Sequence, residues 1–339
     1  MTTYPAPDFR HVLTMTDVRG TFEHALLAVP RREHGYCTDD MARVLVVAAR
    51  EPVPVAELRD LVRLSLRFLS RAQSLEGAYR NRLGPRGRWL DRPALEDSWG
   101  RSIWGLGTAA GRSGTDWVRQ TATIELERAA HRRSPWPRAM AFAAIGAAEL
   151  LATEPRNPTA RALLVDAADA MAPRCDDAGW PWPETRLAYA NAVLPEAMIA
   201  AGSVLARDDL VERGLALLGW LLERETRDGH LSVTAAGGGG RGDVDAAFDQ
   251  QPIEVAALAD ACARAATVEE SDRWADGIAA AAAWFLGDND SHQVMWDPTT
   301  GGSYDGLEVD GVNLNQGTES SLALLSTLQH ARHLVTVPA

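Results

Sequence analysis

Apolar residues recur along this chain with the period of an α-helix, and the helical runs are of two kinds. Runs of the first kind consist almost entirely of Ala, Leu, Val, Ile and Gly, as in MAFAAIGAAELL. A helix that is apolar on most sides must be buried, so these runs are predicted to be inner helices. They lie at about residues 39–50, 97–110, 138–151, 189–205, 250–266 and 316–332.

Runs of the second kind alternate with the first and have charges on one face, as in ELRDLVRLSLRFL, which is typical of helices that border solvent. The alternation predicts an all-α fold, the (α/α)6 barrel, with an inner and an outer ring of helices in one domain over residues 1–339. A helical solenoid is the alternative, but the inner runs are too apolar on all sides for an open superhelix. Outer helices are predicted at about residues 56–73, 117–131, 159–172, 208–225 and 268–287, with 16–28 as a sixth.

The long connectors all precede inner helices, at about residues 74–96, 173–188, 226–249 and 288–315. If the helices alternate in direction, these connectors gather at the end of the barrel where the inner helices begin. Long ordered loops on a rigid scaffold are where binding and catalytic residues concentrate. The sequence therefore predicts a functional site at that end.

Acids, amides and aromatic residues stand at the predicted inner-helix starts, in TDDMAR, LEDSWGR, WPWPETRLAYAN, AFDQQPIEV and NLNQGTESS. Helix capping explains any one of them, and Thr38 or Asp39 is a natural N-cap. Capping does not require the whole set, whereas a polyhydroxylated ligand needs converging carboxylates, amides and rings. We therefore predict a sugar site with substrate-binding residues His34, Tyr36, Trp99, Arg101, Trp180, Trp182, Glu184, Asp249, Gln250, Gln251, Tyr304, Asn315 and Gln316.

Paired carboxylates suit the cleavage of a glycosidic bond, in which one group protonates the leaving oxygen and the other activates water or attacks the sugar. Successive helix residues point about 100° apart, so only one member of each adjacent acidic pair can face the axis. We predict that Asp40 and Asp97 face inwards and that Asp39 caps its helix. The candidate catalytic residues are Asp40, Asp97, Asp39, Glu96, Glu254 and Glu319.

The amino-acid composition disfavours several classes of partner and site. A formal net charge of −12 argues against a nucleic-acid partner and against docking on anionic membranes, and no apolar run is long enough to span a bilayer. The three cysteines Cys37, Cys175 and Cys262 are typical of reduced thiols in a cytoplasmic protein. The 11 tryptophans, several of them in Gly/Pro-rich loops, could offer flat faces to sugar rings. No metal and no cofactor is predicted, because His34 and Cys37 have no second His/Cys cluster beside them.

Several long segments resemble a bacterial family of six-hairpin glycosidase-like proteins that occur alone or joined to glycosyltransferase domains. The segments are REHGYCTDD, EDSWGR, SPWPRAMAFA, DAGWPWPE, LAYANAVLPEAMI, FDQQPIEVAALADA, GGSYDGL and GVNLNQGTESSLALL. The resemblance spans nearly the whole chain and implies a carbohydrate-active (α/α)6 barrel, with a glycosyltransferase as a potential partner. The family has Asn where this chain has Met41 and His where it has Trp99, so substrate preference is expected to differ.

These observations favour a glycoside hydrolase acting on an oligosaccharide or glycan. A sugar epimerase or isomerase on the same barrel is an alternative that would need His at the axis, for which His34 and His292 are the candidates. A terpenoid-cyclase-like barrel is suggested by the TDD triplet but needs an apolar, aromatic-lined cavity. A non-catalytic glycan-binding module would need the tryptophans without the paired acids.

Overall fold

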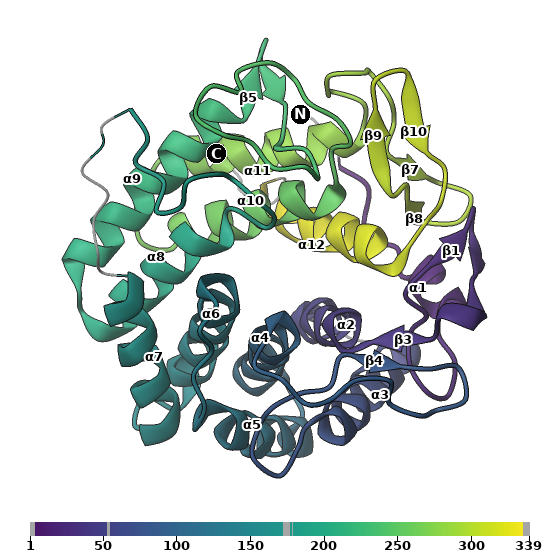
Figure 1. Cartoon of the computed structure of the whole chain (residues 1–339), viewed down its shortest axis with the longest axis vertical. Coiled ribbons are helices and arrows are strands. Elements are labelled where there is room, and N and C mark those ends of the chain that lie inside the picture. The colour runs from purple at the N-terminus through teal and green to yellow at the C-terminus, as the bar shows by residue number, and fades with distance from the viewer. Residues whose placement is uncertain (1–3, 53–54, 172–176, 178, 335–339) are drawn as a thin grey trace.

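Six inner helices form a closed ring in the computed structural model, which describes residues 4–52, 55–171, 177 and 179–334 (Figure 1). Each inner helix packs against the next, and the last packs against the first. The predicted (α/α)6 barrel is therefore confirmed, and the solenoid is excluded. The inner helices are α2 (Thr38–Arg50), α4 (Asp97–Arg112), α6 (Pro137–Thr153), α8 (Val193–Leu205), α10 (Pro252–Ala265) and α12 (Thr318–Leu334).

Five outer helices each pack on the inner helix that precedes them, and Figure 1 shows them around the ring. Their charged faces point to solvent, and their apolar faces cover the inner ring. No helix among the described residues is long and apolar enough to cross a membrane. The outer helices are α3 (Ala56–Ala72), α5 (Asp116–Ala130), α7 (Pro158–Met171), α9 (Asp208–Arg224) and α11 (Asp272–Phe285).

The sixth outer helix predicted at 16–28 is wrong. A short helix, α1 (Arg10–Thr14), precedes this segment, which instead forms a turn and a small hairpin of β1 (Ala25–Leu26) with β2 (Val29–Pro30). The carboxylate of Asp17 accepts a 2.8 Å hydrogen bond from the backbone N–H of Arg19, a local bond that competes with helix formation. Gly20 then lets the backbone lie close against Phe68.

The other boundaries agree with the sequence to within a few residues, and the starts of α8 and α11 differ most, by four residues each. The predicted start of α8 at 189 moves to Val193, because residues 189–192 form a turn in which Ala190 has a φ of 45°. The carboxylate of Glu254 accepts the backbone N–H of Asn191 at 3.1 Å and so holds this turn. Helix α10 begins at Pro252, which suits the first helical position because its missing N–H has no partner there.

The long connectors meet one another at the end of the ring where the inner helices begin, as predicted. Strand β3 (Tyr36–Cys37), before α2, pairs with β4 (Arg82–Leu83), before α4. Backbone bridges join Leu187 to Gly239 and Gln250 to Leu307. The remaining hairpins pair β5 (Thr226–Arg227) with β6 (His230–Leu231), β7 (Trp296–Asp297) with β8 (Gly302–Ser303), and β9 (Gly306–Glu308) with β10 (Gly311–Asn313).

Helices α4 and α6 approach each other most closely through glycines. A Cβ atom on Gly107 would lie 2.0 Å from the carbonyl oxygen of Gly146, and one on Gly100 would lie 2.2 Å from that of Ala139. Helix backbones cannot yield at such contacts without moving a whole helix. The small residues of EDSWGRSIWGLGTAAG therefore set the spacing of this side of the ring.

Gly107→Ala is expected to lower the free energy of unfolding by about 1–3 kcal/mol, the usual cost of overpacking a core. Alanine alone would favour the helix by roughly 1 kcal/mol, so the sign of the change reports the backbone contact. Urea denaturation measures it, with Gly114→Ala as the control because nothing lies within 4 Å of a Cβ there. A Gly107→Ala protein as stable as the control would contradict this packing.

Candidate active site

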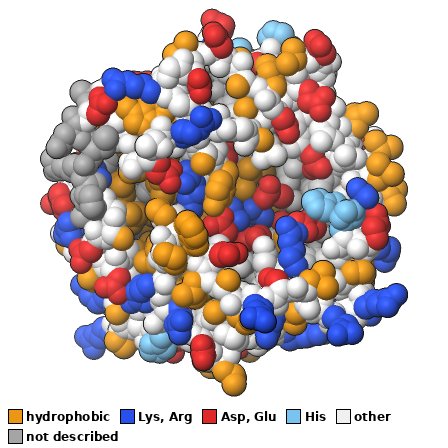
Figure 2. All heavy atoms as spheres, in the orientation of Figure 1, with side chains coloured by type: hydrophobic (Ala, Val, Ile, Leu, Met, Phe, Trp, Pro, Cys, Tyr) orange, Lys and Arg blue, Asp and Glu red, His pale blue; other side chains and the backbone are white. Residues whose placement is uncertain are grey.

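A polar cavity of about 360 Å³ opens at the loop end of the ring. Figure 2 shows charged side chains gathered around a hollow near the middle of this face. The lining comes from the starts of α2, α4, α10 and α12 and from the connectors before them. It contains Glu23, His24, Cys37, Asp39, Asp40, Arg43, Arg82, Arg101, Asp249, Gln251, Pro252, Ile253, Asp305, Asn313, Gly317, Glu319 and Ser320.

One group of charges joins α2 to α12. Asp40 is buried and accepts a 2.8 Å hydrogen bond from Arg43, whose guanidinium also pairs with Glu319. Burial raises the pKa of Asp40 to about 7, although Arg43 lowers it. Burial alone would lower the pKa of Arg43, but Glu319 and Asp40 together raise it. Arg43 thus holds a positive charge beneath Glu319, whose side chain is 42% exposed.

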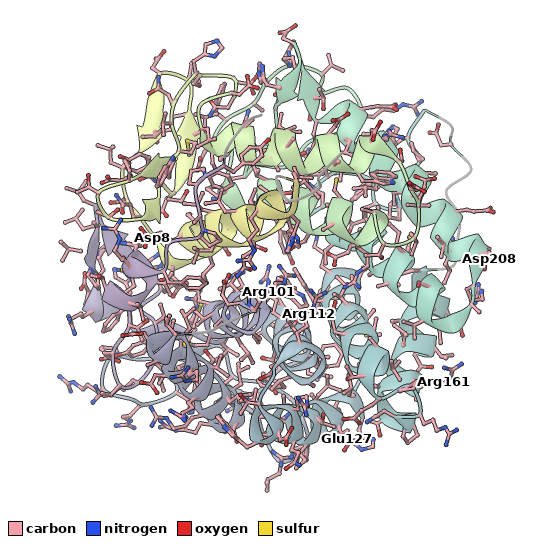
Figure 3. The ribbon with its side chains drawn as sticks, turned by 180° about the vertical axis from the view of Figure 1, so that it is seen from behind. Asp8, Arg101, Arg112, Glu127, Arg161 and Asp208 are labelled. Atoms are coloured by element: carbon pink, nitrogen blue, oxygen red, sulfur yellow. The ribbon has the colours of Figure 1, made fainter. Side chains whose placement is uncertain are left out.

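A second group joins α2 to α4 through Arg101. Its guanidinium lies 3.2 Å from the carboxylates of both Asp39 and Asp97, and its flat face covers Phe142 at 4.8 Å. Figure 3 shows Arg101 projecting from α4 toward the centre of the ring. Burial alone would raise the pKa of Asp39, but Arg101 and Arg43 lower it below its usual value. The Asn81 amide also donates to Asp39 at 2.8 Å.

Two carboxylates of the cavity have no arginine partner among the described residues: Asp305, which accepts the backbone N–H of Gly317 at 2.7 Å, and Asp249. The Oδ1 atom of Asp249 is buried without a hydrogen-bond partner in that part of the chain, and it packs against Gly306, where a Cβ atom would collide with it. Burial raises the pKa of Asp249 to about 6, and the charges of Glu308 and Asp305 add to this. A carboxyl group with these surroundings can hold a proton near neutral pH and release it.

The N-cap of α2 corrects the prediction for the acidic pair. Cys37, not Thr38 or Asp39, occupies the cap, and its sulfur accepts the backbone N–H of Asp40 at 3.4 Å. The Cys37 thiol in turn donates to the Asp40 carboxylate at 3.0 Å. Asp39 is therefore free of a capping role and borders the cavity with Asp40. Cys37 and Cys262 are buried free thiols, and Cys175 lies outside the described residues.

The predicted stacking tryptophans are buried, which contradicts their proposed role. Trp99 is fully buried and donates its indole N–H to the carbonyl of Ala129 at 3.2 Å, on the outer side of α4. Trp180 and Trp182 pack around Trp220 of α9, with ring centroids 5.3 and 6.0 Å away. These rings attach the connector before α8 to the outer ring and offer no face to a ligand.

Other predicted residues serve the structure of the loops. Tyr36 is buried and donates to Asp17 at 2.8 Å, and Gln250 donates to Asp290 at 2.6 Å. Gln316 is buried and accepts from Thr300 at 2.7 Å. Asn315 accepts the backbone N–H of Leu27 at 2.9 Å. Tyr36, Gln250 and Gln316 are thus buried in the loops and lie outside the cavity lining.

Glu254 and Glu184 hold the turn before α8. Burial, with Glu225 nearby, raises the pKa of Glu254 to about 8, while its oxygens bind the N–H groups of the turn. Glu184 pairs with Arg138 at 2.6 Å. Glu254 thus lies outside the cavity lining and holds this turn. Other predicted site residues lie outside the cavity lining as well: Glu96, Asp97, His34, Tyr304 and His292, the last a candidate for the epimerase alternative.

Several site residues were missed from the sequence, and Arg43 is the clearest. It is a lone cation within the apolar inner run MARVLVVAA, and a buried charge of that kind requires partners. Tyr189 stands at a predicted inner-helix start but received no role from the sequence; it lies outside the cavity lining, is 42% exposed, and its ring lies 5.9 Å from the Arg101 guanidinium and 5.0 Å from that of Arg138. Glu23, Arg82 and Asp305 come from connectors whose course no local pattern predicted.

The described residues contain no group of three or more His, Cys, Asp or Glu side chains arranged to hold a metal ion. Arginines pair with Asp39, Asp40 and Glu319, whereas Asp249, with a pKa of about 6, can exchange its proton near neutral pH. Such a site can bind hydroxyl groups and exchange protons with them.

No known protein-family profile and no curated protein sequence matches the chain. Solved structures of similar fold include a sugar epimerase from a ruminal bacterium, with a TM-score of 0.71 and 13% identity over 98% of this chain and 96% of that one. The cellobiose 2-epimerase of Spirochaeta thermophila has a TM-score of 0.68 and 14% identity, over 96% and 93% of the two chains. A GH76 α-mannanase of Bacteroides thetaiotaomicron has a TM-score of 0.60 and 8% identity, over 89% and 88%. These likenesses show a six-hairpin glycosidase-like fold.

Proposed function

We propose that this protein is a carbohydrate-active enzyme that hydrolyses a glycosidic bond in an oligosaccharide or glycan, with Asp249 as the general acid. The observation that supports this most is the contrast among the cavity carboxylates. Asp249 is unpaired with a pKa of about 6, whereas Asp39 and Glu319 lie beside arginines. Two carboxyl groups in different protonation states are what glycoside hydrolysis requires.

In this mechanism Asp249 donates its proton to the leaving glycosidic oxygen as the bond to the anomeric carbon breaks. Glu319, the more exposed member of its ion pair at 42%, is the second carboxylate and activates the attacking water or stabilises the positive sugar ring. Arg43 positions Glu319, and Asp40 positions Arg43 through its 2.8 Å hydrogen bond. Asp40 is thus proposed as a positioning residue in place of the acid–base role predicted for it.

Asp39 and Arg101 would bind substrate hydroxyl groups at one wall of the cavity, and Asp97 would orient Arg101. Gln251 lines the cavity near Asp249 and would bind another hydroxyl group. We also propose a bacterial, cytoplasmic enzyme without a cofactor, whose partner is a glycosyltransferase; the −12 net charge disfavours nucleic acids and anionic membranes.

Tyr189 is the aromatic side chain proposed to stack on the sugar. Tyr189→Ala is expected to raise KM about tenfold, since an aromatic contact contributes about 0.5–1.5 kcal/mol beyond the area that it buries. Tyr189→Phe keeps the ring and is expected to change KM less than threefold. Initial-rate kinetics of the two variants test this, and equal KM values in both would remove Tyr189 from the binding site.

Sugar epimerisation is the second candidate, because structures of similar fold over nearly the whole chain are epimerases. It needs a base that removes a proton beside an open-chain carbonyl, and His24 is the one histidine of the described residues in the cavity lining. A terpenoid-cyclase-like reaction is disfavoured by the charged lining of the same cavity.

One experiment separates these functions. The protein is incubated with defined reducing oligosaccharides, and the products are separated by chromatography and weighed by mass spectrometry. Hydrolysis gives shorter sugars, and epimerisation gives a new species of unchanged mass. An unchanged substrate that nevertheless binds, as seen by tryptophan fluorescence, would leave a glycan-binding module.

A further inference from the structure

A narrow shaft continues from the polar cavity along the axis of the barrel. Arg43, Ile253 and Glu319 line both spaces, so the shaft begins at the floor of the cavity. Beyond this floor, the residues that line the shaft follow one another about one helical turn apart. They are Ala256, Ala257 and Asp260 on α10 and Leu322, Ala323 and Ser326 on α12. The rise along α12 from Glu319 to Ser326 corresponds to a depth of about 10 Å.

The walls of the shaft are apolar and its deep end is polar. Trp104 and Phe142 form one wall, with ring centroids 5.4 Å apart, and alanines from α10 and α12 form the other. At the deep end lie Asp260 and Glu196, the latter 3.8 Å from Arg264. Burial, together with the charge of Asp260, raises the pKa of Glu196 above its usual value, which favours a neutral carboxyl group there.

The size of the shaft limits what can enter it. Its volume is about 50 Å³, and a water molecule needs roughly 10–15 Å³ of such space, so about three to five heavy atoms fit. A sugar ring with its substituents does not fit, but a single exocyclic group does. The indole N–H of Trp104 is also buried without a hydrogen-bond partner among the described residues, so it is available to donate to a ligand.

We propose that the shaft is a specificity subsite that takes the acetamido group of an N-acetylated amino sugar bound in the polar cavity, an inference that rests on the proposed function. The acetamido group has four heavy atoms and matches the volume. Its methyl carbon suits the alanine walls, and its carbonyl oxygen can accept from the Trp104 N–H. A hydroxyl group in its place is too short to pack against the alanine walls, so the apolar part of the shaft would stay unfilled.

Kinetics on matched substrates test this subsite. Chitotriose and cellotriose differ only in acetamido against hydroxyl groups at C2, and the wild type is expected to have at least tenfold higher kcat/KM for chitotriose. Ala256→Leu fills the shaft with three more heavy atoms and is expected to abolish that preference. Trp104→Phe removes the N–H donor and is expected to reduce it threefold to tenfold. Trp274→Phe is the control, because its indole donates to Glu269 on the outer ring at 2.8 Å.

Binding measured beside the kinetics keeps the two proposals separate. Calorimetric titration is expected to show that the wild type binds N-acetylglucosamine but not glucose, and that Ala256→Leu loses this binding. Only variants whose circular dichroism and melting match the wild type are compared. If cellotriose is cleaved as well as chitotriose, or if Ala256→Leu leaves the preference intact, the shaft inference is overturned while hydrolysis stands. If N-acetylglucosamine binds through the shaft but neither trisaccharide is cleaved, the subsite stands and the hydrolase proposal fails. No binding and no cleavage of either sugar would overturn the subsite.

Discussion

Asp249→Asn is expected to lower kcat for oligosaccharide hydrolysis by roughly 10²–10⁴-fold, the usual contribution of a general acid. Asparagine has nearly the same shape as aspartic acid and can still pack against Gly306, but it has no acidic proton to give. Asp310→Asn is the matched control, since it removes one exposed carboxylate between the neighbouring strands β9 and β10. A loss of equal size in both variants would contradict the assignment.

The pH dependence of activity and of stability also tests the Asp249 carboxyl group. With a pKa of about 6, Asp249 is protonated below that pH, so kcat/KM of the wild type is expected to fall as the pH rises through about 6. Because the pKa of Asp249 is higher in the folded than in the unfolded protein, its proton stabilises the fold. This contribution to the free energy of unfolding is present below the unfolded pKa and is lost as the pH rises through about 6. Asp249→Asn should therefore be at least as stable as the wild type at pH 8, measured by thermal melting.

Arg43→Met is expected to lower the free energy of unfolding by about 3–5 kcal/mol at pH 8, because removing one partner leaves a buried charge uncompensated. Asp40 is buried beside Arg43 and depends on it for its charge. The pKa of Asp40, already raised by burial, would rise further in the variant, so the loss should be smaller at pH 5, where Asp40 can take up a proton. Urea denaturation at the two pH values measures this difference.

Two further variants test the pairing of Arg43 with Asp40. Arg63→Met breaks an exposed pair with Asp60 at the same spacing along a helix, and it is expected to cost less than about 1 kcal/mol. Asp40→Asn combined with Arg43→Met should recover part of the lost stability, because the buried charge is gone. A double variant less stable than the sum of the single changes would contradict a pairwise account of Asp40 and Arg43.

The ring of helices could be predicted because the apolar composition of the inner runs itself indicates that they are buried. A segment such as MAFAAIGAAELL has no polar face, so α6 can only lie inside another layer. The segment 16–28 has enough apolar residues for a helix, but the Asp17 turn and the contact of Gly20 with Phe68 decide its conformation. Such local bonds and long-range contacts have no periodic signal.

The position of the site could also be predicted, whereas the role of single residues could not. Connector lengths placed the polar groups at one end of the barrel, and carboxylates from α2 and α12 do border one cavity there. Which member of the pair Asp39 and Asp40 is free depended on Cys37, an unusual cap. The loop tryptophans were misread because their burial depends on Trp220, which lies about 40 residues away in the chain.

Asp249 is proposed to protonate the leaving group of a glycoside, and the dependence of the rate on the leaving group tests this role without ambiguity. Wild type and Asp249→Asn are compared on an oligosaccharide, whose leaving oxygen needs a proton, and on the dinitrophenyl glycoside of the same sugar, whose leaving group does not. We predict a loss of at least a hundredfold on the oligosaccharide and less than tenfold on the dinitrophenyl glycoside. Equal losses on both substrates would contradict a proton donor at Asp249.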